Sequence, residues 1–271
     1  ETDVFFVVPM GLVSTLQATK GVVVHTGAAA TTLVASIQNH RPAWKDIRVR
    51  KAIGCYGIDR KLIVSNALRG LTVPWNSFAA PGAKDPIDLT AMCPYDPEKA
   101  KTLLAEAGHG PSNPLKFSMT ISNIDPSFID VAQILKTSFA KIGAQMDIQI
   151  VDNATWSRLN SRMRALDMSL MNFVPTLDVN SNSHTFYSKT ALAYYEMNDS
   201  KLDAMLERWR STVDPEEQIG ISHQIQRHIA EMAYYPALAG SPFFQATRDR
   251  VKGWKFMNKL VFDLKDVWLD R

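Results

Sequence analysis

The apolar positions along the chain follow a helical period in some segments and a period of two in others. Across residues 128–142 they recur every three to four residues, which predicts an amphipathic helix that ends at Gly143. Directly afterwards, apolar and polar residues alternate over 145–150, the pattern of a half-buried strand. A helix followed at once by a strand is typical of a layered α/β domain.

The same alternation continues towards the C-terminus. We expect a helix to begin near Trp156, and the apolar run 167–174 between turn signals predicts a strand. The polar segment 176–184 follows that strand, and helical spacing of apolar residues returns over 202–209 and 219–232. The fold class predicted from these segments is therefore α/β.

Helix starts are marked by a recurring Asp-Pro pair. Asp96, Asp125 and Asp214 each precede a proline and then a periodic segment. In such a pair the aspartate caps the helix and the proline takes a first-turn position that needs no N–H donor. The clearest example is the segment 94–108, whose helix ends at Gly108. These residues build structure and carry no chemistry.

The segment 94–108 is also the last of four motifs in a fixed order. The series is D-I-R-V-R-K-A-I at residues 46–53, I-D-R at 58–60, a turn with Gly and Pro at 70–82, and Y-D-P-E-K-A-K-T-L-L-A-E-A-G at 95–108. This series resembles the extracytoplasmic solute-binding proteins of peptide, opine and nickel ABC importers, which are bacterial solute-binding family 5. Three later segments resemble the closing part of that family: Tyr234–Pro236, Val251–Gly253 and Asp266–Trp268.

The resemblance implies the second lobe of a periplasmic-binding-protein-like fold of type II, with hinge segments and a mixed sheet flanked by helices. Residues 1–40 would belong to the hinge and the first lobe, and residues 41–232 would form the second lobe. Residues 233–271 would return to the hinge and the first lobe. Family members carry a signal sequence and a large first lobe before this point, so we expect the sequence to be the C-terminal portion of a longer protein.

Composition and charge narrow the class of protein. A chain of 271 residues that is 46% hydrophobic can bury one sizeable core or two smaller ones. Its longest apolar run, 4–13, is about half of the roughly 20 residues that a membrane-spanning helix needs. The net charge of +3 is too small to indicate a nucleic-acid partner. Arg48, Arg50 and Lys51 form a basic cluster, but at helical spacing they lie opposite an apolar stripe, so we expect them to face solvent.

The sequence offers no metal-binding or catalytic motif. Cys55 and Cys93 lack metal-ligand spacing, and packing as free cysteines is favoured, although an exported protein could also join them. His223 and His228 are five residues apart, not the four that direct two rings at one metal. Phosphate-loop, dinucleotide-binding, zinc-helix and nucleophile-elbow motifs are missing. We therefore expect no metal, no cofactor and no enzymatic activity.

The resemblance places a ligand-facing loop directly after the strand at 167–174. The predicted solute contacts in this part are Met171, Asn172, Phe173 and Asp178. The family often carries W-x-x-D-x-x-D-P here, whereas Phe173 replaces Trp, Thr176 replaces the first Asp and Val179 replaces Pro. That first Asp pairs with the peptide α-amine in some members, so such a salt bridge is not expected at this position. Asp178 would either supply a displaced charge or cap the loop.

Further candidates lie on both sides of this loop. Trp75 and Asn76 occupy a turn that approaches the cleft in the resembled fold, and Trp75 would either stack on a solute or plug the edge of the lobe. His184, with Tyr187, would line the cleft after the Asp178 loop. Trp156 is a single aromatic residue on a predicted helix, and we expect it in the core.

The resemblance implies a periplasmic or other extracytoplasmic receptor that binds a small polar solute, such as an oligopeptide or an opine-like amino-acid derivative. The solute would lie in a cleft between two lobes and pass to an ABC permease. The receptor would associate with the membrane through that permease or a lipid anchor. Two alternatives from other classes stay open: the ligand-sensing region of a cytoplasmic transcriptional regulator, and a hydrolase that has kept this fold.

From the sequence alone, Phe173→Ala and Asp178→Ala are expected to weaken solute binding without unfolding the lobe, because both residues would face the cleft. Isothermal titration against peptides, opines and metal chelates measures this. Unchanged affinity in both variants would mean that the loop faces solvent.

Overall fold

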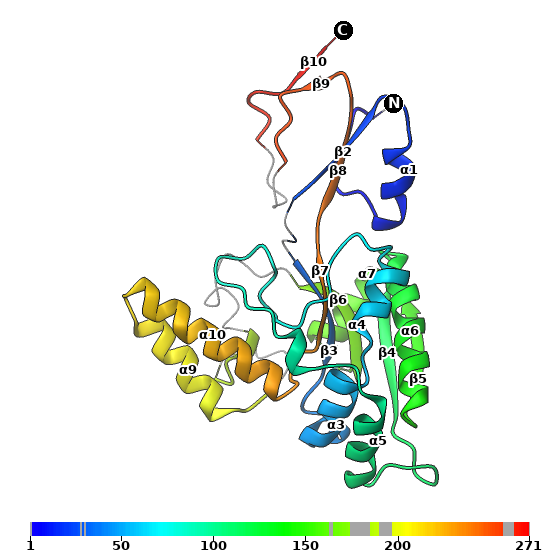
Figure 1. The fold of residues 1–271 in the computed structure, drawn as a ribbon, viewed down its shortest axis with the longest axis vertical. Coiled ribbons are helices and arrows are strands. Elements are labelled where there is room, and N and C mark those ends of the chain that lie inside the picture. Colours follow the sequence, from blue (N-terminus) through cyan, green and yellow to red (C-terminus); the bar gives the residue numbers. More distant parts are fainter. Residues whose placement is uncertain are drawn as a thin grey trace.

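The chain folds into a large α/β part with a smaller, mostly β part beside it (Figure 1). The computed structural model describes residues 2–27, 29, 31–162, 165–173, 185–189, 197–256 and 263–270. Among these residues, none of the helices has both the length and the hydropathy that a membrane-spanning helix requires.

A five-stranded sheet forms the centre of the large part. Its strands are β3 (Thr31–Ile37), β4 (Lys116–Ser122), β5 (Gln145–Val151), β6 (Met168–Phe173) and β7 (Ala237–Ser241), in the order β5-β4-β6-β3-β7. β5, β4 and β6 are parallel to one another, whereas β3 is antiparallel to both β6 and β7. The sheet is therefore mixed, and the predicted α/β fold class is confirmed. All seven residues of β3 are buried, as expected for a strand covered on both faces.

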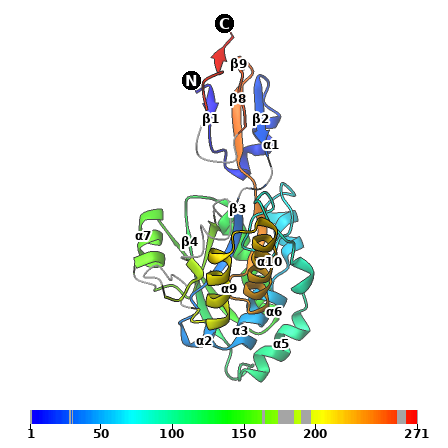
Figure 2. The ribbon, with the colours of Figure 1, turned by 90° about the vertical axis from the view of Figure 1, so that its left-hand side faces the viewer.

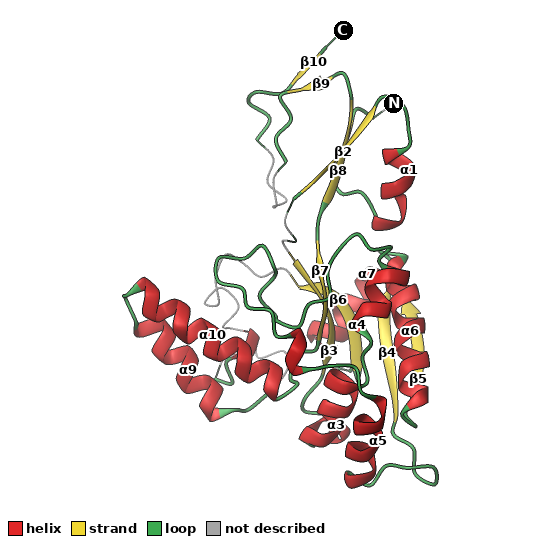
Figure 3. Ribbon diagram, in the orientation of Figure 1, coloured by secondary structure: helices red, strands yellow, loops and turns green. Residues whose placement is uncertain are grey.

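Helices cover both faces of this sheet (Figure 3). One face packs against a layer built from α2 (Pro42–Lys45), α3 (Ile47–Lys51), the π-helical turn η2 (Ala52–Tyr56), α4 (Arg60–Leu62), the π-helical turn η3 (Ile63–Ala67), α5 (Pro97–Glu106) and α6 (Ser127–Lys141). The short η4 (Thr90–Met92), α7 (Asn153–Ser157) and the π-helical turn η5 (Arg158–Arg162) lie in the connections. The hairpin of α9 (Ser200–Ser211) and α10 (Pro215–Glu231) packs on the second, separate hydrophobic cluster. The helices expected over 94–108, 128–142, 202–209 and 219–232 are thus confirmed.

The small part is built around a three-stranded antiparallel sheet. Its strands are β1 (Val4–Phe5), β8 (Phe244–Arg248) and β2 (Val22–Thr26), and the short helices η1 (Met10–Leu12) and α1 (Val13–Gln17) lie between β1 and β2. A separate pair, β9 (Val251–Lys252) and β10 (Trp268–Leu269), lies near the C-terminal end.

Two neighbouring links connect the small part to the large part (Figure 2). The first link follows β2, and the structure describes its residues Gly27 and Ala29. The second link runs from β7 to β8 through residues 242–243. β2 pairs with β8 on one side of the links, and β3 pairs with β7 on the other. The sheets thus divide the chain at these links, while the assignment of residues 1–40, 41–232 and 233–271 to two lobes stays a prediction.

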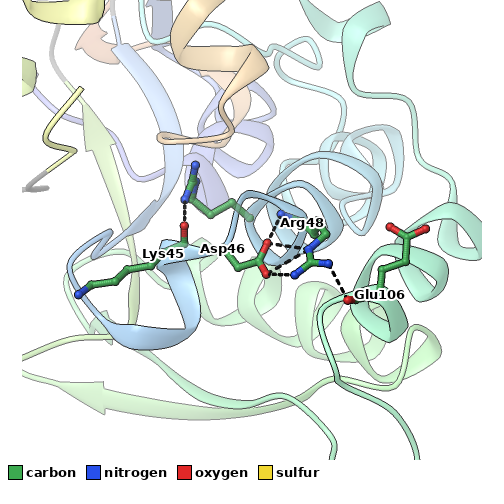
Figure 4. A network of polar contacts seen from close by, with 5 residues as sticks. Lys45, Asp46, Arg48 and Glu106 are labelled. Atoms are coloured by element: carbon green, nitrogen blue, oxygen red, sulfur yellow. Dashed lines mark hydrogen bonds and ion pairs between the residues drawn. The ribbon is translucent and has the colours of Figure 1, made fainter. Parts of the chain in front are cut away.

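The arginines of the D-I-R-V-R motif connect separate helices. Arg48 forms an ion pair with Asp46 at 2.6 Å and donates to the backbone carbonyl of Glu106 at 2.7 Å, which ties α3 to the end of α5 (Figure 4). Arg50 is only 4% exposed and donates to the carbonyls of Trp44 at 2.7 Å and Met232 at 3.0 Å. The expectation that Arg50 faces solvent is therefore wrong, because backbone carbonyls from two distant segments compensate for its burial.

A buried polar cluster holds the α9–α10 hairpin to the rest of the large part. The Asp199 carboxylate caps α9 and lies 2.7 Å from His228 Nε2, and it also accepts a hydrogen bond from the Tyr234 hydroxyl at 3.1 Å. Burial acts to raise the pKa of Asp199, but the hydrogen bonds from His228, Leu202 and Tyr234 outweigh it and the net shift is downward. The Arg50 guanidinium lies 4.7 Å from the centre of the Tyr234 ring.

Burial, followed by the negative charge of Asp199, raises the pKa of Tyr234 to about 12. Since an unfolded tyrosine titrates near pH ~10, Tyr234 contributes stability that is present below that pH and lost as the pH rises towards 12. We expect the difference in tyrosinate absorbance between the wild type and Tyr234→Phe to show a titration step close to pH ~12. A step at the ordinary value, near ~10, would contradict the buried placement.

Cys55 and Cys93 form a disulfide, with their Cα atoms 4.6 Å apart. The expectation of two free, packed cysteines is therefore wrong. Cys55 does lie on the buried face of its helical turn, but the loop before α5 brings Cys93 against the same face. The two cysteines are 38 positions apart in the sequence. The periodicity of a short segment therefore could not predict that they lie together.

Reducing this disulfide should lower the free energy of unfolding by about 2–4 kcal/mol, because the bond closes a long loop in the unfolded chain. Urea denaturation with and without dithiothreitol measures the change. A Cys55→Ser/Cys93→Ser double variant serves as the control and should be insensitive to the reductant. Identical wild-type midpoints in both conditions would show that the bond does not form.

Candidate functional site

One edge of the large sheet faces the small part of the molecule (Figure 1). β4, β5 and β6 run parallel and β7 runs in the same direction, so their carboxyl ends meet at the edge where β3 begins. In open α/β sheets, ligands bind beyond the carboxyl ends of the strands. A solute site is therefore expected at this edge.

A cavity of about 220 Å³ lies at this edge. We call it the edge cavity, and its lining residues are Ser122, Ile124, Phe128, Asn153, Trp156, Leu170, Met171 and Asn172. They come from the ends of β4 and β6, the first turns of α6 and α7 and the connection between β4 and α6. Four separate elements of the fold thus converge on one hollow.

Trp156 lines the edge cavity and carries a buried polar atom in its indole ring. Asp152 caps α7 by accepting from the Thr155 amide at 2.9 Å, and this cap fixes the helix turn that carries the indole ring. The Nε1 atom of Trp156 is buried and has no hydrogen-bond partner among the residues that the structure describes. A buried N–H left unpaired is costly, and such groups call for an explanation such as a bound partner.

The walls of the edge cavity are apolar or neutral. Ile124, Phe128, Leu170 and Met171 supply the apolar surface, and Ser122, Asn153 and Asn172 supply amide and hydroxyl groups. Ser122 Oγ and Asn153 Oδ1 lie 3.3 Å apart, which ties the end of β4 to the start of α7. No Lys, Arg, Asp or Glu lines the cavity among the residues that the structure describes. The cavity is therefore suited to an uncharged group.

The three predicted contacts on β6, Met171, Asn172 and Phe173, do not all line the edge cavity. Successive strand residues point to opposite faces, so Asn172 lies on the other side of the sheet from Phe173. Asn172 is exposed and lines the edge cavity, and Met171 lines it while its sulfur accepts from the Tyr235 hydroxyl at 3.7 Å. Phe173 is 7% exposed and packs against Tyr235 and Phe186, with ring centres 5.2 and 6.1 Å away. Of the three, Phe173 belongs to the hydrophobic core.

Trp75 and Asn76 are held by the scaffold. The Trp75 indole N–H donates to the carbonyl of Ala79 at 2.7 Å, and the side chain is 8% exposed. Asn76 is 4% exposed, accepts from Arg60 at 3.0 Å and donates to the Leu89 carbonyl at 3.1 Å. For Trp75 this arrangement favours plugging the edge of the lobe. A contact between either side chain and a solute stays a prediction.

The remaining predicted contacts, Asp178 and His184, lie outside the described residues. Within the described part of the chain, no group of three His, Cys, Asp or Glu side chains is placed to hold a metal ion. Trp156 was expected in the core, yet it is half-buried and lines the edge cavity. The sequence does place Trp156 shortly after the predicted strand at 145–150, and this position could have indicated a site at the carboxyl end of that strand.

The family model of the bacterial extracellular solute-binding proteins, family 5, matches residues 1–194 of the chain. The chain belongs to this family. The family predicted from the four ordered motifs is thereby confirmed.

Relatives with similar sequences are also solute-binding proteins. The chain is 26% identical to di/tripeptide-binding protein 2 of Pseudomonas aeruginosa, over 90% of this chain and 46% of that protein. It is also 26% identical to the oligopeptide-binding protein AppA of Bacillus subtilis, over 98% of this chain and 52% of AppA. The chain thus spans about half the length of these curated relatives.

Solved structures share the fold over almost the whole chain. The structure of Bacillus subtilis AppA in complex with a nonapeptide matches with a TM-score of 0.89, at 22% identity, over 99% of this chain and 56% of AppA. NikA of Staphylococcus aureus, solved with Ni(L-His)2, matches with a TM-score of 0.82, at 22% identity, over 94% of this chain and 55% of NikA. These matches confirm the periplasmic-binding-protein-like fold.

The packing of Phe173 changes what its removal should do. We expect Phe173→Ala to lower the free energy of unfolding by about 3–5 kcal/mol, since it opens a cavity within an aromatic cluster. Urea denaturation measures the loss, and Asn172→Ala, on the opposite face of the same strand, is the control with little effect. Stability close to that of the wild type would instead support the earlier expectation of a cleft-facing Phe173.

Proposed function

We propose that the protein is an extracytoplasmic receptor that captures a small polar solute and delivers it to an ABC permease. The observation that carries the proposal is the edge cavity, with the unpaired indole N–H of Trp156 at the carboxyl edge of the sheet. Membership of the solute-binding family supports the same role.

The size of the edge cavity favours a site that is only one half of the binding surface. Its volume of about 220 Å³ lies below the roughly 300–1,000 Å³ of typical small-molecule sites. It has room for one side chain or a short stretch of a larger solute. The rest of the solute would be covered from across the edge, by the part of the molecule beyond the two links, when the lobes close and expel water.

The chemistry of the walls favours an oligopeptide over a charged ligand. Trp156 offers a donor, Asn153 and Asn172 offer amide groups, and the remaining wall is mainly apolar. A peptide backbone with an uncharged side chain satisfies such a surface, whereas a metal chelate or a carboxylate-rich opine would lack compensating charge here. The two relatives compared above are named for peptides, which agrees with this choice.

The Cys55–Cys93 disulfide supports a location outside the cytoplasm, where disulfides form and persist. A cytoplasmic regulator would keep these thiols reduced, and the relatives compared above are solute-binding proteins rather than regulators. Because these relatives are solute-binding proteins, we propose binding rather than hydrolysis as the activity. The ABC permease would be the membrane partner.

Removing the indole of Trp156 tests the proposal. Trp156→Ala should weaken binding of an uncharged oligopeptide by about 10- to 100-fold, which corresponds to roughly 1.4–2.8 kcal/mol of lost interaction. Isothermal titration of the intact protein with a peptide panel measures the change.

Two isoleucines provide the matched control. Ile124 and Ile150 are 65% and 51% exposed, but only Ile124 lines the edge cavity. Ile124→Ala should therefore weaken binding, and Ile150→Ala should leave it unchanged. Unaltered affinity in Trp156→Ala and Ile124→Ala would place the solute elsewhere, and turnover of a peptide by the wild type would overturn the receptor role.

A further inference from the structure

Residues 72–82, which we call the hinge strap, run along β7 at the point where the large part meets the two links. The Thr72 hydroxyl donates to the carbonyl of Gly240, and the Gly240 amide donates to the Val73 carbonyl at 3.1 Å. One step further along, Pro74 bridges Ala239 in antiparallel fashion. The hinge strap thus pairs with the last residues of β7 before the second link.

The far end of the hinge strap contacts the first link. The Gly82 amide donates to the carbonyl of Ala29 at 2.9 Å. Ala29 lies between β2 and β3, so this bond joins the hinge strap to the first connection, while Gly240 lies just before the second. The hinge strap therefore contacts the first link and the end of β7 that leads into the second link.

Close packing at Gly240 brings the hinge strap and the first link together. A Cβ atom at Gly240 would lie 2.9 Å from Pro81 Cγ and 3.0 Å from Ala29 Cβ. Real Cβ contacts essentially never fall below 3.0 Å, so any side chain here must displace Pro81 or Ala29. Glycine at this position is needed for close approach rather than for backbone conformation.

The hinge strap itself is fixed to the large part. Ser77 Oγ donates to Gln226 of α10 at 2.7 Å, and Asn76 is bonded to the buried Arg60. The Trp75 indole closes the strap on itself through Ala79. Because its middle is anchored in this way, we expect the hinge strap to stay with the large part when the small part rotates about the links.

From these contacts we infer that the hinge strap acts as a stop that sets the angle between the small sheet and the large sheet. Turning the small sheet changes backbone angles in both links, as in hinge motions generally. Such a turn breaks the Gly82–Ala29 bond or slides Ala29 against Gly240 and Pro81. The stop therefore favours one range of angles. This effect on the angle does not depend on the proposed function. An effect of the stop on solute affinity would rest on that function.

Distance measurements on the intact protein without solute test the stop. Spin labels attached through Ser14→Cys on α1 and Lys136→Cys on α6 report the angle, since both positions are exposed and the native cysteines are paired. Adding Gly240→Ala should broaden the distance distribution and shift its mean by more than the wild-type width. Thr72→Val, which removes one strap contact, should produce a smaller shift in the same direction.

A second glycine provides the matched control. A Cβ atom at Gly220, on α10, meets nothing within 4 Å, so Gly220→Ala should reproduce the wild-type distribution. If Gly240→Ala does not fold, Thr72→Val decides alone. A wild-type distribution in folded Gly240→Ala and Thr72→Val would overturn the stop. These distances need no solute, so the result is independent of the outcome of Trp156→Ala.

Discussion

The buried guanidinium of Arg60 is the interaction on which the arrangement of the large part depends. It is 3% exposed, and burial lowers its pKa to about 10, so it stays charged at neutral pH. Backbone carbonyls and one side-chain amide compensate for this charge. The carbonyls belong to Gly54 and Cys55 in η2, Cys93 in the loop before α5 and Ala237 in β7, and the amide is that of Asn76. A buried charge tolerates the loss of such partners poorly, so one side chain fixes the spacing between the helical layer and the sheet.

This constraint extends to the second link and to the hinge strap. Through Ala237 it positions β7, which leads directly into the second link, and through Asn76 it holds the middle of the hinge strap. The edge cavity, by contrast, is set by the ends of β4 and β6 and the starts of α6 and α7, at the same edge of the sheet. The edge cavity and the hinge strap thus lie against the same sheet.

Much of this architecture could be predicted from local patterns, because caps, proline positions and apolar periodicity act within a few residues. The helix of 94–108 begins with the Asp96 cap, as its sequence indicates. Features that depend on distant segments could not be predicted. Arg50 is buried by carbonyls such as that of Met232, and the disulfide depends on where the loop before α5 travels. The helical spacing around Trp156 and the alternation of residues around Phe173 did not indicate which of these side chains lines a cavity and which packs in the core.

Under the proposed function, the solute lies over the edge cavity and pairs with the Trp156 indole. A crystal structure of the intact protein with a bound oligopeptide tests this most directly. We expect a peptide acceptor atom about 2.7–3.2 Å from Trp156 Nε1, with an uncharged group between Asn153 and Asn172. A peptide bound elsewhere, with the Trp156 N–H still unpaired, would contradict it.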